Sequence, residues 1–260
     1  MTLRSNVLKV KGRSTEVLVA GSGAPVVYMH GAGIIAGFEF LTALSHRFRV
    51  VAPLMPGYGA TEPDPLPTSR DEVAEHTRDV LDTLGIERTV LVEHSVGGWL
   101  AAAFAAIFPE RVTLLVLAAP FGIRLPGYPA PDLGAMSPQE RAGVMTSDPG
   151  ILRGRLPDRP DPVFTATRAR ERAALRGFLP GPVDPELPAV LPRIGMPTRL
   201  VWGEDDQVSA PALVGEWHRA IPHAMVRTVR GGGHLLLNER PDILPAVLGD
   251  PRAQEVTLPT

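Results

Sequence analysis

The sequence predicts an α/β protein with a mostly parallel, twisted sheet of about eight strands and helices on both faces. Eight short apolar runs are separated by turns or by helical patterns. Most of these runs are apolar at successive positions, which is typical of strands that are buried on both faces. Strands that alternate with helices are joined by right-handed crossovers, so the order of the elements indicates a parallel sheet.

The strands are predicted from the places where these runs begin and end. Residues 7–11 and 15–20 are predicted to form an opening hairpin, with Gly12-Arg13-Ser14 as its turn. Each later run ends at glycine, proline or polar residues, which punctuate strands. These later strands are predicted over residues 26–29, 48–52, 89–92, 112–118, 198–202 and 224–229.

The helices are predicted from apolar periodicity and from their end signals. Ser69-Arg70-Asp71-Glu72 matches a capping box, so a helix is expected from there to about Leu84, where Gly85 ends it. Four further helices are expected over residues 38–45, 97–108, 211–220 and 240–247.

Residues 120–190 differ from the rest because they are rich in Pro, Gly and Arg and show weak periodicity. Helices over 137–145 and 165–178 are expected within them. We interpret this segment as a cap (lid) inserted after strand 6, with residues 1–119 and 191–260 forming the core domain. A long flexible loop is the alternative, and it is disfavoured because structureless loops of this length are uncommon inside compact domains.

The composition and net charge of the chain exclude several classes of function. The chain has 260 residues, of which 44% are hydrophobic, and a net charge of −2, so no general attraction to nucleic acid is expected. It has no cysteine, which excludes thiol nucleophiles and disulfides. No run approaches the roughly 20 apolar residues of a membrane span, and the first ten residues do not resemble a signal peptide. A cytoplasmic protein without membrane contact is expected, as a monomer or homodimer.

Residues 92–99, Val-Glu-His-Ser-Val-Gly-Gly-Trp, carry the most information about chemistry. Ser95 stands between a predicted buried strand and a predicted helix, with Gly97 two residues later, which is the layout of a nucleophile elbow. An N-cap of the following helix is the alternative role for Ser95. Glu93 occupies the position where the usual G-x-S-x-G pattern has its first glycine.

Three other strands end in glycine-rich or polar signatures. They end at His30-Gly31-Ala32-Gly33, at Gly203-Glu204-Asp205-Asp206 and at Gly231-Gly232-Gly233-His234. All should meet Ser95 at the C-terminal edge of the sheet. The order serine, acid, histidine at these strand ends resembles the α/β-hydrolase fold superfamily, in the branch with a cap after the sixth strand.

The resemblance implies a role for each of these residues. Ser95 would be the nucleophile, His234 the base and Asp206 the acid that orients the histidine, with Asp205 as the alternative acid. The backbone N–H groups of Ala32 and Val96 would form the oxyanion hole. Without the resemblance, His234 reads as a surface-loop histidine and residues 30–33 as a plain glycine turn. His30 and His94 are expected to have structural roles.

Glu93 has three possible consequences. Its side chain could extend into space left by small neighbours and leave catalysis intact. It could bring a second carboxyl group close to His234. It could also distort the elbow and weaken the enzyme. A buried carboxyl group there needs a partner or keeps its proton.

The sequence therefore predicts an esterase- or lactonase-like serine hydrolase that cleaves a small-molecule ester, lactone or similar acyl substrate through an acyl-enzyme. A lyase, isomerase or cyclase that uses the same residues for proton transfer is the first alternative, and a non-catalytic receptor is the second. Candidate pocket residues are Glu93, Phe38, Trp99 and Phe121, each of which could instead pack in the core. An arginine-rich part of the cap could attract an anionic substrate or form a solvated face; it comprises Arg153, Arg155, Arg168, Arg170 and Arg172.

No cofactor or metal is expected. No Gly-Lys-Ser/Thr follows Gly31 to Gly37, so a phosphate loop is excluded, and the spacing of these glycines does not match a dinucleotide-binding motif. The sequence also lacks a clustered set of metal ligands.

Overall fold

The structure, a computed structural model, contains an eight-stranded sheet. It describes residues 2–63, 67–152, 155–157, 159, 161–179, 181 and 183–249. The strands are β1 (Arg4–Val10), β2 (Arg13–Ala20), β3 (Ala24–Met29), β4 (Phe48–Pro53), β5 (Thr89–His94), β6 (Val112–Ala118), β7 (Thr198–Gly203) and β8 (Met225–Val229).

The strand order is β1-β2-β4-β3-β5-β6-β7-β8. β2 runs antiparallel to both of its neighbours, β1 and β4, and every other pair is parallel. The C-terminal ends of β3 to β8 therefore lie along one edge of the sheet. The predicted fold class is confirmed.

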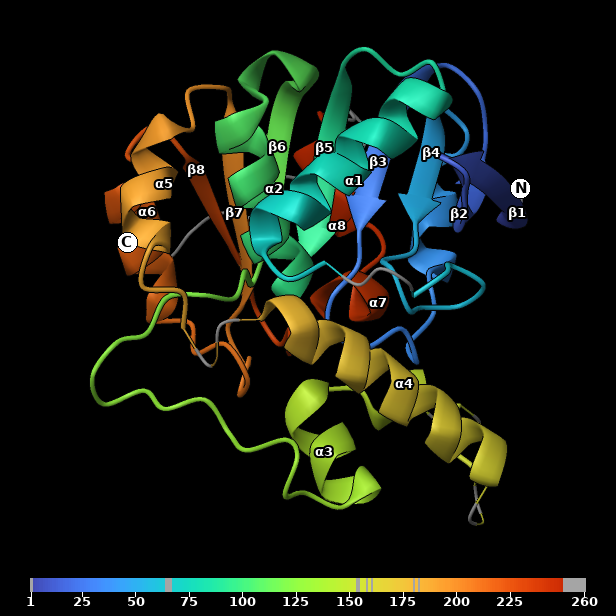
Figure 1. Cartoon of the computed structure of the whole chain (residues 1–260). Coiled ribbons are helices and arrows are strands. Elements are labelled where there is room, and N and C mark those ends of the chain that lie inside the picture. The colour runs from blue at the N-terminus through green and yellow to red at the C-terminus, as the bar shows by residue number, and fades with distance from the viewer. Residues whose placement is uncertain are drawn as a thin grey trace.

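Helices cover both faces of this sheet (Figure 1). The apolar runs of the central strands supply both faces, because side chains alternate along a strand. In β5, for example, Leu91 belongs to one buried cluster and Val92 to the other. The first face packs on α1 (Arg70–Thr83), α2 (Val96–Ile107) and α6 (Leu213–Ala220), and the second on the 3₁₀ helix η1 (Glu39–Leu44), α7 (Leu236–Glu239) and α8 (Ile243–Val247).

Three helical predictions need correction in detail. Ser69 accepts a hydrogen bond from the Glu72 N–H, but the Glu72 carboxylate accepts from the Thr68 N–H at 2.8 Å instead of completing the box on Ser69. Residues 39–44 form a 3₁₀ helix rather than an α-helix. The helix predicted over 240–247 begins at Ile243, and a short helix, α7, precedes it.

The chain between β6 and β7, called the β6–β7 segment (residues 119–197), contains the helices expected there. Figure 1 shows α3 and α4 beyond the edge of the sheet at which the β3 and β4 arrows end. Ser137 and Glu140 form a complete capping box at the start of α3, a motif that was not predicted from the sequence. The helical elements are α3 (Pro138–Met145), η3 (Pro149–Leu152), α4 (Pro162–Phe178), α5 (Leu187–Val190) and η4 (Leu191–Arg193). A further 3₁₀ turn, η2 (Pro109–Arg111), precedes β6.

The buried carboxylate of Asp184 ties the part of this segment that leads into β7 to the rest of the fold. Asp184 accepts a hydrogen bond from Trp99 Nε1 at 2.7 Å and forms an ion pair with Arg70 at the start of α1. The Asp184 N–H also donates to the Gly122 carbonyl at 3.1 Å. One residue thus joins α1 and α2 through its side chain and both ends of the β6–β7 segment through its backbone.

Removal of this carboxylate should be costly. Asp184→Ala leaves the Arg70 guanidinium, 10% exposed, and the Trp99 N–H without their shared acceptor. We expect the free energy of unfolding, measured by urea denaturation, to fall by about 3 kcal/mol. Glu186→Gln is the control, because Glu186 pairs with the same arginine but is 79% exposed, so its loss should change stability by less than about 1 kcal/mol. Equal losses in the two variants would contradict the prediction.

Candidate active site

Ser95 lies at a sharp turn between β5 and α2. Its backbone has φ 57° and ψ −117°, a conformation that non-glycine residues rarely adopt. Hydrogen bonds from the end of β6 hold this turn: the Ser95 N–H donates to the Ala118 carbonyl at 3.0 Å, and the Phe121 N–H donates to the Ser95 carbonyl at 2.9 Å. The Ser95 side chain is therefore presented at the C-terminal edge of the sheet.

Gly97 is required at this turn by the close approach of α2 to β3. A Cβ atom at Gly97 would collide with the carbonyl oxygens of Met29 and His30. The glycine two residues after the serine thus allows the helix to begin directly over the neighbouring strand.

Ser95, His234 and Asp206 form a hydrogen-bonded row. Ser95 Oγ lies 3.0 Å from His234 Nε2, and His234 Nδ1 lies 2.9 Å from Asp206 Oδ2. The histidine and the aspartate are 2% and 3% exposed, whereas the serine is only partly buried. The row is open to solvent at its serine end, and it has the geometry of a nucleophile, its base and an orienting acid.

Asp206 rather than Asp205 faces the histidine. The turn after β7 fixes Asp206, whose Oδ1 accepts hydrogen bonds from the Val208 and Ser209 N–H groups at 2.8 Å each. Asp205 is exposed, and its N–H donates to the Gly232 carbonyl. The carboxylate that meets His234 is thus held on both oxygens.

The side chain of His94, directly before Ser95, contacts the backbone of His234, the candidate base. His94 Nε2 donates to the His234 carbonyl oxygen at 2.7 Å, and the two rings lie 4.6 Å apart between centroids. Burial, with a smaller contribution from His234, lowers the pKa of His94 to about 3. His94 therefore stays neutral beside His234.

His30 supports the turn that carries Ala32. The Met55 N–H donates to His30 Nε2 at 3.0 Å, and His30 Nδ1 lies 2.8 Å from the Gly31 carbonyl, which assigns the ring proton to Nδ1. Burial lowers the pKa of His30 to about 4, so the ring is neutral. Tyr58 Oη donates to the Ala32 carbonyl at 2.9 Å. Ala32 itself is exposed, on the same sheet edge as Ser95.

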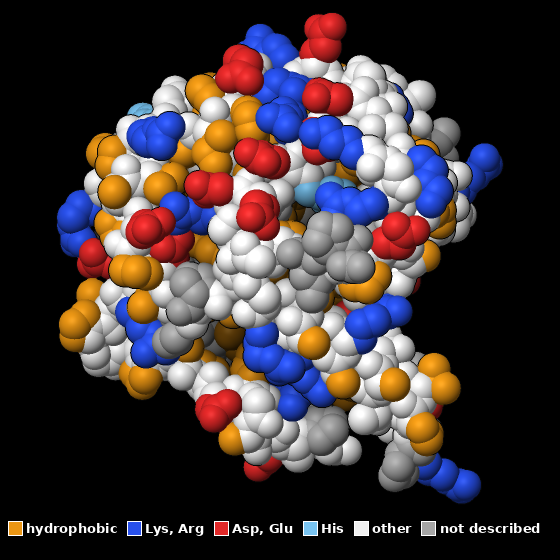
Figure 2. Space-filling model, viewed as in Figure 1, with side chains coloured by type: hydrophobic (Ala, Val, Ile, Leu, Met, Phe, Trp, Pro, Cys, Tyr) orange, Lys and Arg blue, Asp and Glu red, His pale blue; other side chains and the backbone are white. Residues whose placement is uncertain are grey.

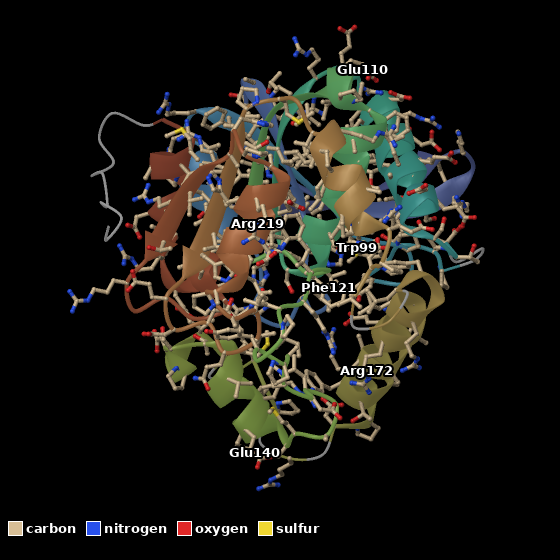
Figure 3. All side chains as sticks on the ribbon, turned by 90° about the vertical axis from the view of Figure 1, so that its left-hand side faces the viewer. Trp99, Glu110, Phe121, Glu140, Arg172 and Arg219 are labelled. Atoms are coloured by element: carbon tan, nitrogen blue, oxygen red, sulfur yellow. The ribbon has the colours of Figure 1, made fainter. Side chains whose placement is uncertain are left out.

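The four candidate pocket residues lie in different surroundings. Figure 3 shows Trp99 and Phe121 next to each other where the sheet meets the β6–β7 segment. Their rings pack edge to face, with 6.3 Å between the ring centroids. Trp99 is 1% exposed and also stacks on Phe178 of α4. Phe38 is partly buried and packs edge-on against Tyr28.

Glu93, the fourth, is fully buried on the α2 side of the sheet. The carboxyl group lies beside Gly98, where a Cβ atom would be 3.7 Å from its Oε1. Neither oxygen makes a hydrogen bond of normal geometry within the described residues, and burial raises the pKa of Glu93 well above 4.5, opposed weakly by the Ala101 N–H. The carboxyl group thus lies in the space beside Gly98, and the backbone at Ser95 still has the positive φ of a tight turn.

The arginine-rich part of the β6–β7 segment is only partly solvated. Figure 2 shows basic side chains gathered where this segment meets the sheet and its helices. Arg168 is 16% exposed and pairs with the buried Glu171 at 2.6 Å, whereas Arg170 and Arg172 are exposed. Arg155 pairs with Glu39 across the two parts of the fold. Arg153 lies outside the described residues.

Two polar residues near His234 were not identified from the sequence. Ser147 follows α3 and Glu239 ends α7, and both contact the chain around Gly233. The sequence offered only an indirect signal, namely that Glu239 precedes the Arg240-Pro241 step that follows the histidine. The described residues contain no group of three His, Asp or Glu side chains that could hold a metal ion, and none of their helices is long and apolar enough to cross a membrane.

The chain belongs to the alpha/beta hydrolase family, since residues 18–246 match that family. An uncharacterized protein of Mycobacterium tuberculosis is 27% identical over 261 residues, covering 89% of this chain and 76% of its own length. The 2-hydroxy-6-oxo-2,4-heptadienoate hydrolase of Pseudomonas putida is 38% identical over 118 residues, which cover 43% of each chain.

Solved structures show the same fold. The 2-hydroxy-6-oxo-6-phenylhexa-2,4-dienoate hydrolase of Rhodococcus sp. strain RHA1 superposes with a TM-score of 0.79 at 22% identity, covering 95% of this chain and 97% of that one. Naproxen esterase from Bacillus subtilis superposes with a TM-score of 0.74 at 20% identity, covering 95% and 90%.

The buried Glu93 should make stability depend on pH. The folded state keeps the carboxyl proton, while the unfolded chain releases it above about pH 4.5, so the contribution of Glu93 is full below that pH and is lost as pH rises. Glu93→Gln, which cannot ionise, should therefore gain stability over the wild type by about 1.4 kcal/mol per pH unit above this point, until the raised pKa is reached. Urea denaturation from pH 4 to 8 measures the difference.

Exposed Glu87 provides the control for this prediction. Glu87→Gln should follow the wild type across the whole pH range. A Glu93→Gln variant whose stability difference from the wild type does not change with pH would contradict a protonated Glu93.

Proposed function

We propose that the protein is a serine hydrolase that cleaves a small ester, lactone or similar acyl substrate through an acyl-enzyme. The observation that carries the proposal is the row from Ser95 Oγ through His234 to Asp206, at 3.0 and 2.9 Å, on a turn with positive φ. Membership of the alpha/beta hydrolase family supports a hydrolytic reaction.

In the first half of the reaction, Ser95 Oγ attacks the acyl carbon while His234 Nε2 takes the serine proton. The backbone N–H groups of Ala32 and Val96 bind the oxygen that becomes negative. Asp206 accepts the Nδ1 proton in a hydrogen bond and stabilises the imidazolium. Collapse of the tetrahedral intermediate breaks the bond to the leaving alcohol, which receives the proton from His234.

In the second half, water attacks the acyl-enzyme and gives its proton to His234 Nε2. The tetrahedral intermediate collapses, Ser95 Oγ leaves and regains the proton, and the carboxylic product is released. A neutral His94 suits this cycle, because a second positive charge beside His234 would oppose formation of the imidazolium.

Residues 120–190, which form most of the β6–β7 segment, act as the cap of this site, with residues 1–119 and 191–260 as the core domain. The placement of α3 and α4 beyond the C-terminal strand edge supports this division (Figure 1). Phe121, which is partly buried at the junction, lines the apolar side of the substrate space with the buried Trp99 packed against it, and Phe38 lies near the Ala32 turn.

The test is covalent labelling and ester turnover. A fluorophosphonate probe should label the wild type at Ser95, as mapped by peptide mass spectrometry. Ser95→Ala should abolish labelling and lower ester kcat/KM at least about 10³-fold. Ser137→Ala, at an exposed cap on α3, is the matched control and should leave both unchanged. Failure of the wild type to label would overturn the proposal, and turnover that survives Ser95→Ala would favour proton-transfer chemistry.

An acidic substrate is favoured by Arg168. Its Nη2 donates to Glu171 at 2.6 Å, but its Nε and Nη1 are buried and have no hydrogen-bond partner within the described residues. Arg170, on the same helix, donates to the Gly59 carbonyl at 3.0 Å, and the adjacent Tyr58 donates to the Ala32 carbonyl, so α4 passes near the proposed oxyanion turn. Relatives named as hydrolases of oxo-dienoates act on anions, which agrees with such a substrate.

Paired esters test this preference. Arg168→Gln should lower kcat/KM about tenfold or more for an aryl ester with a free carboxylate in its acyl chain, because a charge-assisted hydrogen bond is lost. The neutral ester of the same length should change by less than about twofold. Arg172→Gln on the same helix is exposed and should affect neither ester. Equal loss on both esters in Arg168→Gln would contradict a carboxylate site.

A further inference from the structure

The β6–β7 segment is hydrogen-bonded to the loop that carries His234, called the histidine loop (residues 230–235). Ser147 Oγ donates to the Gly231 carbonyl at 2.7 Å, and the Leu235 N–H donates to the Met145 carbonyl at 2.8 Å. One contact precedes His234 in the chain and the other directly follows it. The end of α3 therefore holds the histidine loop on both sides of the histidine.

The Glu239 carboxylate links Ser147 to the histidine loop. Its Oε2 accepts from the Gly233 N–H at 2.7 Å and lies 2.8 Å from Ser147 Oγ, whose single proton is shared between this carboxylate and the Gly231 carbonyl, while its Oε1 accepts from the Ser147 N–H at 3.2 Å. Hydrogen bonds to an ionised acceptor are stronger than neutral ones. Glu239 comes from α7, so three separate pieces of chain meet at this carboxylate.

Gly233 shows how closely these pieces are packed. A Cβ atom there would lie 2.7 Å from the Ser147 N and 2.9 Å from Glu239 Oε1, closer than real side chains approach. The backbone of Gly233 does not have a positive φ, so the close approach, rather than backbone conformation, requires glycine. The residue next to His234 is thus pressed directly against the β6–β7 segment.

We propose that Glu239 and Ser147 are positioning residues that hold the histidine loop against the β6–β7 segment and thereby set the distance from His234 to Ser95. The proposal rests on the proposed role of His234 as the base. The three residues Met145, Ser147 and Glu239 are called the clamp. The clamp couples the position of the β6–β7 segment to the position of His234. Loss of the hydroxyl group of Ser147, an exposed residue, therefore slows the reaction.

The chain offers a matched pair of controls within the same segment. Ser137 and Glu140 also form a serine–glutamate pair, in the capping box at the start of α3. Figure 3 places Glu140 at the end of the segment far from the sheet. Ser137→Ala and Glu140→Gln test the loss of a comparable pair that does not touch the histidine loop.

The experiment compares Ser147→Ala and Glu239→Gln with these controls. The amide introduced by Glu239→Gln would place a donor against the N–H and O–H groups that now donate to the Glu239 carboxylate. We expect kcat for a small neutral ester to fall about tenfold in both clamp variants with KM within about twofold, because the base is misplaced while the substrate space is unchanged. The controls should keep wild-type kcat and KM.

Rescue and coupling distinguish positioning from damage to the fold. Ser147→Thr keeps the hydroxyl and should restore kcat to within about threefold of the wild type. The double variant Ser147→Ala/Glu239→Gln should lose less than the product of the two single losses, because both act on one unit. Wild-type kcat in Ser147→Ala, or an equal fall in Ser137→Ala, would overturn the proposal.

Amide hydrogen exchange tests the clamp even if the protein shows no esterase activity. Exchange at residues 231–235 should be faster in Ser147→Ala and Glu239→Gln than in the wild type, and unchanged in the two controls. Unchanged exchange in both clamp variants overturns the clamp. If the clamp variants exchange faster but no fluorophosphonate labels the wild type, the clamp stands and only the proposed function is refuted.

Discussion

The backbone conformation at Ser95 is the constraint on which the rest of the site depends. A non-glycine residue with positive φ is held only when its surroundings determine it fully. Hydrogen bonds with Ala118 and Phe121 provide this support, and the absence of a side chain at Gly97 lets α2 begin close to the end of β3. The same contacts fix the start of α2 over β3 and point the serine hydroxyl at the sheet edge.

The histidine side of the site is built differently. Ser95 is fixed by the sheet itself, whereas His234 lies on a loop whose partners come from β5, α3 and α7. Loops are mobile unless such partners restrain them, so the position of the His234 ring depends on these contacts. His94 links the two sides, because it adjoins Ser95 in sequence and donates to the His234 carbonyl in space.

Glu93 shows how the fold accommodates a residue that does not match the usual elbow pattern. Its carboxyl group extends beside Gly98 into the interface between the sheet and α2, away from solvent. Burial keeps the carboxyl group protonated, so the fold avoids an isolated charge in its core at the expense of stability at higher pH. The departure from the pattern therefore affects stability more directly than it affects the geometry of Ser95.

Periodicity and glycine-rich strand ends in the sequence determined the strands, the fold class and the edge at which Ser95, Asp206 and His234 would meet, because these are local or regular properties of the chain. Tertiary structure decided which aspartate faces His234, since Asp205 and Asp206 differ only in how the turn after β7 points them. It also decided that Glu93 is buried and that Ser147 and Glu239 meet at Gly233. Ser147 lies 92 residues before Glu239, and no local pattern links residues that far apart, because only packing brings them together.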